Sequence, residues 1–255
     1  MNHRIGMGVI RVVCRNGRVW RKYIVSSLVG NLGQPLLFLL AFGFGVGQRI
    51  ELVEGYSYLQ FIAPGLAASA VMYSAAFETT YGSYTRLSTQ STFEGILMTP
   101  VTVEEIAVGE IIWGALKGLI SGVVMILAMP LFGLWPSPWV VALLPVLFIA
   151  GMVFSALGLI MTALARSYEF FNYFISLVIT PLFLFSGIFF SLRELPVLTR
   201  SFLECVPLTP VVSLSRMFCY GDFSGNIVGR SLYVMAFAAV ATLIATLLLR
   251  RRLIK

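Results

Sequence analysis

The sequence predicts an all-α membrane protein, and three observations lead to this fold class. Only 11% of the 255 residues are charged and 58% are hydrophobic, whereas a soluble domain carries about 25% charged residues. Six nearly uncharged runs each have about the 20 residues that a helix needs to cross a bilayer. The cations gather at the chain ends and in short segments between the runs, which is typical of membrane topology. We therefore expect one membrane domain over residues 1–255.

The first element is a predicted amphipathic helix at residues 4–22. At about 100° per residue its cations fall within one narrow arc of the helix. The opposite face carries Val9, Ile10, Val13 and Trp20. Such a helix is suited to lying in the headgroup layer, with its cations toward lipid phosphates, and a solvated helix is the alternative. The membrane-surface cations are Arg4, Arg11, Arg15, Arg18 and Lys22.

The six apolar runs are the predicted transmembrane helices. Six crossings place both termini on one side of the membrane. The N-terminal helix and the tail Arg250–Lys255 are both basic, so the positive-inside rule predicts cytoplasmic termini. The connection 81–105 would then be cytoplasmic as well. The predicted spans are residues 24–47, 59–80, 106–131, 139–164, 170–191 and 231–249.

A short helix is predicted within the cytoplasmic connection, at residues 91–99. Ser91 and Glu94 have capping-box spacing, in which a hydroxyl and a carboxylate satisfy each other's backbone amides. Pro100 cannot continue the helix and should end it near Met98. An ordinary connecting loop is the alternative to a rigid helix with a function.

The next helix has a start signal of its own. Thr102 and Glu105 repeat the capping-box spacing directly before the third apolar run. The short helix and the third span should therefore be joined by a tight, well-defined link.

The segment 193–220 is too apolar for a free loop and, with its three prolines, too broken for a span. We expect a re-entrant helical hairpin on the outer side, and a folded external cap is the alternative. The arginines of this region run against the positive-inside rule, and they are Arg193, Arg200, Arg216 and Arg230.

Several functional classes are excluded by residue type. A P-loop requires Gly-Lys followed by Ser or Thr, and no lysine in the sequence has those neighbours, so any ATPase must be another subunit. His3 is the sole histidine, so we expect neither a metal site nor catalytic residues. The net charge of +7 follows topology, so we expect no nucleic acid. Cys205 and Cys219 can share a compartment, and the sequence leaves open whether they form a disulfide.

Three ionisable residues fall within the second and third runs or beside them: Glu78, Glu110 and Lys117. A charge at the bilayer centre costs about 3 kcal/mol or more, so each is a candidate functional residue. Lys117 lies two helical turns after Glu110, about 10 Å deeper, and its stem is long enough to snorkel to the interface. Snorkelling or structural pairing is one interpretation, and a role in the substrate path or in coupling is the other.

The last three runs contain no charge near their middle, which argues against an ion-coupled secondary carrier. The fifth run is instead rich in aromatic residues. Helix packing and an aromatic belt explain them in one interpretation. In the other they form a sliding surface for a lipid tail or a sugar face, with Tyr173, Phe174 and Phe185 as candidates.

Four motifs, in this order and spacing, resemble the ABC-2 type permeases, the membrane half of bacterial ABC exporters. The first is the Pro-Gly pair at 64–65, and the second is Phe-Glu-Gly-Ile-Leu-Met-Thr-Pro-Val-Thr at 93–102. The third is Leu-Phe-Ser-Gly-Ile-Phe-Phe-Ser-Leu-Arg-Glu-Leu-Pro at 184–196, followed by Pro-Leu-Thr-Pro at 207–210. Length and loop style look closest to the nodulation protein J type, whose members export lipo-oligosaccharides.

The resemblance implies a transport subunit without an ATPase site of its own, in the bacterial inner membrane. Two copies would pair as a homodimer, each docking one ATP-binding subunit that supplies ATP and Mg²⁺. An amphipathic substrate such as a lipid-linked saccharide would move outward. Drug or antibiotic efflux is the main alternative, and an ion-coupled carrier is a weaker one. Docking would use the short cytoplasmic helix, formed by Thr92, Phe93, Glu94, Gly95, Ile96, Leu97 and Met98.

Overall fold

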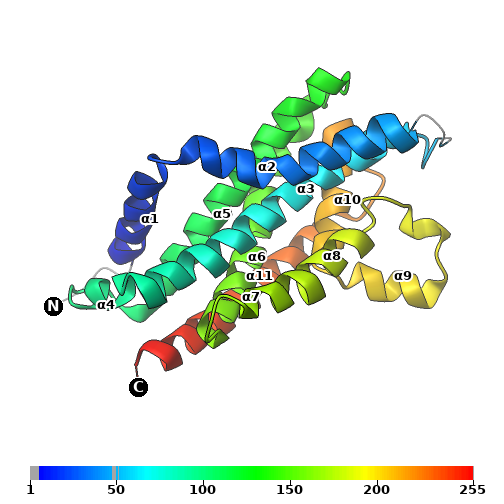
Figure 1. Ribbon diagram of the computed structural model, residues 1–255. Coiled ribbons are helices and arrows are strands. Elements are labelled where there is room, and N and C mark those ends of the chain that lie inside the picture. Colours follow the sequence, from blue (N-terminus) through cyan, green and yellow to red (C-terminus); the bar gives the residue numbers. More distant parts are fainter. Residues whose placement is uncertain (1–5, 48–49, 51, 255) are drawn as a thin grey trace.

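The computed structural model describes residues 6–47, 50 and 52–254, and every regular element in these residues is a helix. The long helices lie side by side in one bundle (Figure 1). The all-α prediction is therefore confirmed. In chain order the α-helices are α1 (Met7–Trp20), α2 (Ile24–Leu40), α3 (Tyr58–Phe77), α4 (Thr92–Leu97), α5 (Val103–Ala128), α6 (Leu143–Leu164), α7 (Phe170–Phe174), α8 (Thr180–Phe185), α9 (Val197–Glu204), α10 (Leu208–Tyr220) and α11 (Ile227–Leu253), and the π-helical segments are η1 (Ala41–Val46), η3 (Glu78–Gly82), η4 (Thr85–Thr89) and η7 (Ile175–Ile179).

Length and composition give four to six candidate membrane spans in the described residues. The four continuous ones are Tyr58–Thr89, Val103–Phe132, Pro138–Leu164 and Ile227–Leu253. A bent pair, Ile24–Gly30 with Gly33–Gly43, turns by 40° and covers the first predicted run. A second pair, α9 with α10, turns by 87° within the segment expected to be a re-entrant hairpin. The fifth predicted run holds a shorter apolar helix.

That fifth run, predicted to span 170–191, is helical only over Phe170–Phe185. The chain turns at Gly187, whose φ of +77° is a geometry that favours glycine. Beyond the helix end, Arg216 Nη2 donates to the carbonyls of Gly187 and Ile188 at 2.6 and 3.2 Å. The helix therefore ends before the predicted end of this span, and an arginine from α10 satisfies carbonyls that lie beyond the helix end.

The connection predicted at 81–105 is also helical in its first part. The helix that begins as α3 continues through η3 and η4 to Thr89. Polar residues lower the hydropathy of this extension, yet Tyr84 and Arg86 are 4% and 9% exposed. The extension is thus a buried part of the bundle, which hydropathy alone does not indicate.

The core of the bundle is α3, packed between α5 and α6. Gly114, Gly118 and Gly122 of α5 form a stripe at four-residue spacing that contacts α3 or its extension, and at Gly114 and Gly122 also α6. A Cβ added at Gly118 would lie 2.9 Å from the carbonyl oxygen of Val71, so the two backbones approach closely. The third and second spans are therefore packed with little room between them.

Both ends of the described chain lie beside the start of α5, at the same end of the bundle as α4 (Figure 1). The backbone amide of Gly8 donates to Glu105 Oε1 at 3.1 Å. Near the other terminus, Arg250 Nη1 lies 3.3 Å from Glu104 Oε1. We call this the α4 end, and the opposite end, with α9 and its loops, the α9 end.

The face of α1 that packs against α5 differs from the apolar face predicted from the sequence. Its buried residues are Gly8, Val12, Asn16 and Trp20, whereas Ile10 is 63% exposed. The reason lies in α5. Gly109 leaves room for the side chain of Val12, and Glu110 accepts a hydrogen bond from Asn16. Of the other residues predicted for the apolar face, Val9 and Val13 are half-buried, and the predicted cation Arg4 lies outside the described residues.

Candidate functional site

The short helix α4 is anchored on one side and free on the other. Phe93 is fully buried, and Ile96 and Leu97 pack against the same apolar cluster, which includes residues of α5, α6 and α11. Glu94, Gly95 and Met98 are exposed, Met98 by 88%. A Cβ added at Gly95 would meet no atom within 4 Å. The helix therefore presents an open surface while its back is fixed to the bundle.

Of the two predicted capping boxes, one is present. The Glu105 amide donates to Thr102 Oγ1 at 3.2 Å, and the Thr102 amide donates to Glu105 Oε2 at 3.0 Å. Ser91 precedes α4 as predicted but makes no side-chain cap, because its backbone is left-handed with φ +46°. The predicted Ser91–Glu94 box is thus wrong.

Behind α4 lies a buried cluster of four charges, Glu78, Arg86, Glu110 and Lys117, here called the ion cluster. Arg86 Nη2 lies 2.9 Å from Glu78 Oε1 and 2.6 Å from Glu110 Oε2. Lys117 Nζ lies 2.6 Å from Glu78 Oε2. The four residues are between 0% and 9% exposed. Two cations and two carboxylates make the ion cluster neutral, so each buried charge is compensated.

Neutral side chains complete the hydrogen bonding of both carboxylates. Asn16 Nδ2 and Ser83 Oγ donate to Glu110 at 2.7 and 2.6 Å. Trp113 Nε1 donates to Glu78 Oε1 at 2.9 Å. Because Asn16 belongs to α1, the ion cluster joins α1, the extension of α3 and α5. Such a satisfied buried network holds its helices in one arrangement.

The local backbone explains how these side chains meet. Glu78 opens η3 and Arg86 lies in η4, and π-helical turns widen a helix and often mark functional sites. Gly82 leaves space between them, since an added Cβ would lie 3.1 Å from Glu78 Oε1 and 3.4 Å from Arg86 Nη2. The sequence therefore provides both the charges and the gap in which they pair.

Two contacts tie this region to α4 and to the neighbouring connection. Arg15 Nη2 of α1 donates to Thr92 Oγ1, in the first turn of α4, at 3.4 Å. The hydroxyl of Tyr168 lies 2.9 Å from Thr85 Oγ1 and 3.1 Å from Thr89 Oγ1, and these hydrogen bonds lower the pKa of Tyr168. Because α4 also packs against η4, a displacement of α4 would act on α1 and on η4, which carries Arg86.

The sequence identified three members of the ion cluster and missed the fourth. Lys117 does not snorkel to an interface but pairs with Glu78, so the structural-pairing interpretation describes it. Arg86 was missed because it falls in a segment whose hydropathy predicted a loop. Its position eight residues after Glu78 was the signal that could have found it.

The remaining candidates lie apart from one another. Phe174 is buried in the core at 3% exposure, whereas Tyr173 and Phe185 are exposed by 67% and 51%. Among the α1 cations, Arg15 is half-buried, and burial together with the nearby Arg86 charge lowers its pKa. The other described cations, Arg11, Arg18 and Lys22, are exposed.

Neither a disulfide nor a metal centre is formed by the residues that the structure describes. Cys205 is exposed and Cys219 buried, both as free thiols. No three acidic, histidine or cysteine side chains in residues 6–47, 50 and 52–254 come together as metal ligands.

These features define a multi-pass helical membrane protein with one short helix exposed at the α4 end. Comparison with known families narrows this class. Residues 10–220 match the model of the ABC-2 type transporter, so the chain belongs to that family. It is accordingly a transport permease subunit without an ATPase domain, and ABC permeases work with a separate ATP-binding subunit.

Curated relatives extend the similarity over nearly the whole chain. Nodulation protein J of Rhizobium leguminosarum bv. viciae is 35% identical over 252 residues, which are 98% of this chain and 96% of the relative. Nodulation protein J of Rhizobium meliloti (strain 1021) is 36% identical over 253 residues, 97% of this chain and 95% of the relative. The inner membrane transport permease YadH of Escherichia coli (strain K12) is 30% identical over 211 residues, 82% of this chain and 78% of the relative.

Proposed function

We propose that this chain is the permease of an ATP-driven exporter that moves an amphipathic substrate outward across the bacterial inner membrane. The proposed substrate is a lipo-oligosaccharide or another lipid-linked saccharide, the class implied by the resemblance to the nodulation protein J type. Two copies of the chain pair, and each docks one ATP-binding subunit at the α4 end. Both termini are then cytoplasmic.

The observation that carries the proposal is the construction of α4. Its back is fixed by a fully buried Phe93, and its outer face, with Glu94, Gly95 and Met98, has no cover in the described chain. A helix fixed in this way moves as a rigid unit when a partner pushes on it. The same helix is linked to α5 through the Thr102 cap and to α1 through Arg15.

In the proposed mechanism, ATP brings the two partner subunits together, and they displace both copies of α4. The displacement reaches η4 and α1, which the ion cluster joins to α5. The helices that share the ion cluster then shift together, and the interface between the two permeases opens for the substrate. Because the charges stay paired, none of them needs to be exposed to lipid during the shift.

Docking is tested by replacing Gly95 with Trp and isolating the tagged chain in mild detergent. The added ring meets no atom of the chain near its Cβ, so loss of the ATP-binding subunit would report on the partner and not on folding. Gly45→Trp is the matched control, because a Cβ at Gly45 also meets nothing within 4 Å. Gly45 lies in η1, which packs near the start of α3 and away from α4. Unchanged one-to-one recovery with Gly95→Trp would refute the docking assignment.

The substrate and the energy source are tested in inverted membrane vesicles that contain the permease and its ATP-binding subunit. ATP-dependent uptake of a labelled lipo-oligosaccharide, resistant to a protonophore, is the expected result. Uptake of hydrophobic drugs in place of the saccharide would support the efflux alternative. Uptake without ATP that a protonophore abolishes would support an ion-coupled carrier.

A further inference from the structure

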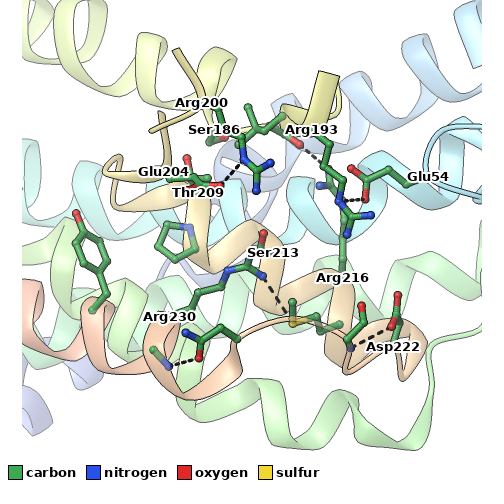
Figure 2. A pocket seen from close by; sticks show the side chains of 18 of the residues that line it. Glu54, Ser186, Arg193, Arg200, Glu204, Thr209, Ser213, Arg216, Asp222 and Arg230 are labelled. Carbon is green, nitrogen blue, oxygen red and sulfur yellow. Dashed lines mark hydrogen bonds and ion pairs between the residues drawn. The ribbon is translucent and has the colours of Figure 1, made fainter. Parts of the chain in front are cut away.

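A charged cavity of about 540 Å³ lies at the α9 end, far from the ion cluster. A volume of this size is typical of sites for small ligands or head groups. Its walls come from α9, α10, the start of α11 and the loops beside them (Figure 2). The cavity is lined by all four arginines of the predicted outer segment that run against the positive-inside rule, namely Arg193, Arg200, Arg216 and Arg230.

Two of these arginines are neutralised by carboxylates. Arg200 Nε lies 2.8 Å from Glu204 Oε1, one turn further along α9. Arg193 Nε lies 3.7 Å from Glu54 Oε2. These two pairs contribute no net charge to the cavity.

The other two arginines form no ion pair with any described residue. Arg216 is occupied with backbone carbonyls, to which its Nε and Nη2 donate, and its guanidinium lies 3.6 Å from the centre of the Phe61 ring. Arg230 makes one weak contact, from Nη1 to Met217 Sδ at 3.9 Å. The third acid, Asp222, accepts from the Ser224 amide and pairs with neither arginine. The cavity therefore carries a net positive charge, with Arg230 as its most available donor.

Exposed apolar side chains lie on α9 and α11, the two helices that carry Arg200 and Arg230. On α9, Leu198 and Phe202 are 87% and 73% exposed, close in sequence to Arg200. On α11, Val228 and Leu232 are 69% and 58% exposed and flank Arg230 in sequence. A ligand with an anionic head for the cationic cavity and a hydrocarbon tail for the exposed apolar side chains of α9 and α11 matches this combination.

We propose that the cavity binds a phosphate group carried by an amphipathic molecule. Arg230 is the main ligand, because a guanidinium donates two parallel hydrogen bonds to a phosphate and this one forms no ion pair with the residues that the structure describes. Ser213 lines the same cavity (Figure 2), and its hydroxyl makes no hydrogen bond to the described residues, so it supplies a further donor. This site stands independently of the proposed docking and export functions.

Binding is tested on the full-length chain in detergent by native mass spectrometry with phosphatidylglycerol. Dioleoylglycerol, which lacks the phosphate, and glycerol 3-phosphate, which lacks the tail, are the comparison ligands. We expect phosphatidylglycerol to bind and dioleoylglycerol not to bind. If glycerol 3-phosphate binds as tightly as phosphatidylglycerol, the bound phosphate comes from a soluble phosphate ester. If glycerol 3-phosphate binds only weakly, the bound phosphate belongs to a lipid. Equal binding of dioleoylglycerol and phosphatidylglycerol would overturn the proposal.

Substitutions of the lining residues test whether this cavity is the binding site. Arg230→Gln should weaken phosphatidylglycerol binding by about tenfold, the effect of losing a charge-assisted hydrogen bond. Arg251→Gln is the matched control, since Arg251 is exposed at the other end of the same helix. If Arg230→Gln does not fold, Ser213→Glu serves instead and should weaken binding through repulsion. Unchanged affinity in the folded variant would overturn the site.

Discussion

Lys117 and Glu78 lie with Nζ and Oε2 2.6 Å apart, although they belong to different helices and are 7% and 6% exposed. Inside a membrane domain each of these charges alone would be strongly unfavourable. Together with Arg86 and Glu110 they form a neutral set whose hydrogen bonds reach three segments of the chain. The stability of the bundle at this point should therefore depend on the set remaining complete.

Glu78→Gln is expected to lower the free energy of unfolding by about 3 kcal/mol, because it leaves Lys117 buried without a carboxylate. The measurement is unfolding with sodium dodecyl sulfate in mixed micelles. Glu94→Gln, an exposed change of the same kind, is the control and should have little effect. Adding Lys117→Met to Glu78→Gln should restore part of the loss, and strictly additive effects would show that the two side chains are not coupled.

Thr102→Ala should destabilise the protein by about 1 kcal/mol through loss of the capping box of α5. Ser91→Ala should leave stability nearly unchanged, because the Ser91 side chain makes no cap. The same unfolding titration measures both variants. Equal losses would mean that Ser91 caps α4 after all.

Gly118→Ala should destabilise the contact between α3 and α5 by about 1–3 kcal/mol, the usual range for overpacking. The new Cβ would lie 2.9 Å from a backbone carbonyl, which cannot rotate away as a side chain can. Gly45→Ala is the control, since its Cβ meets nothing within 4 Å. Thermal unfolding midpoints of the two variants provide the comparison, and a midpoint of Gly118→Ala at or above that of the control would contradict the close packing.

Arg252→Gln should loosen the junction between α11 and the end of α6. Its Nη1 donates to the carbonyls of Thr162, Ala163 and Ala165, of which the first two are 2.8 and 3.0 Å away. Losing these charge-assisted bonds should cost about 1–3 kcal/mol. Arg251→Gln, at the exposed neighbour, should cost almost nothing. Hydrogen exchange at the end of α6 would rise in the first variant only, and similar exchange in both would argue against this junction.

Much of the fold follows from periodicity and residue type. Long apolar runs predict the main helices, and Thr102 with Glu105 marks the start of α5 because a capping box is a purely local signal. The end of the fifth run could not be predicted, since it depends on Arg216, an arginine from a later helix. The buried face of α1 also depends on a distant partner, α5.

The candidate site likewise contains residues that the local sequence reveals and one that only the folded structure reveals. Glu78, Glu110 and Lys117 stand out in the sequence because charges are rare in apolar runs. Arg86 does not, because the polar residues around it lower the hydropathy and conceal a continuous helix. Only the register of α3 against α5, set by close glycine contacts such as that at Gly118, brings all four side chains together.

The pairing in the ion cluster also has a consequence for how the chain enters the membrane during synthesis. Glu78 leaves the ribosome before Lys117, and each alone opposes partition of its helix into lipid by about 3 kcal/mol. As a pair they remove most of that penalty from each other. We therefore expect α3 to remain beside the translocon until α5 has been synthesised, and the two helices to insert together as a helical hairpin.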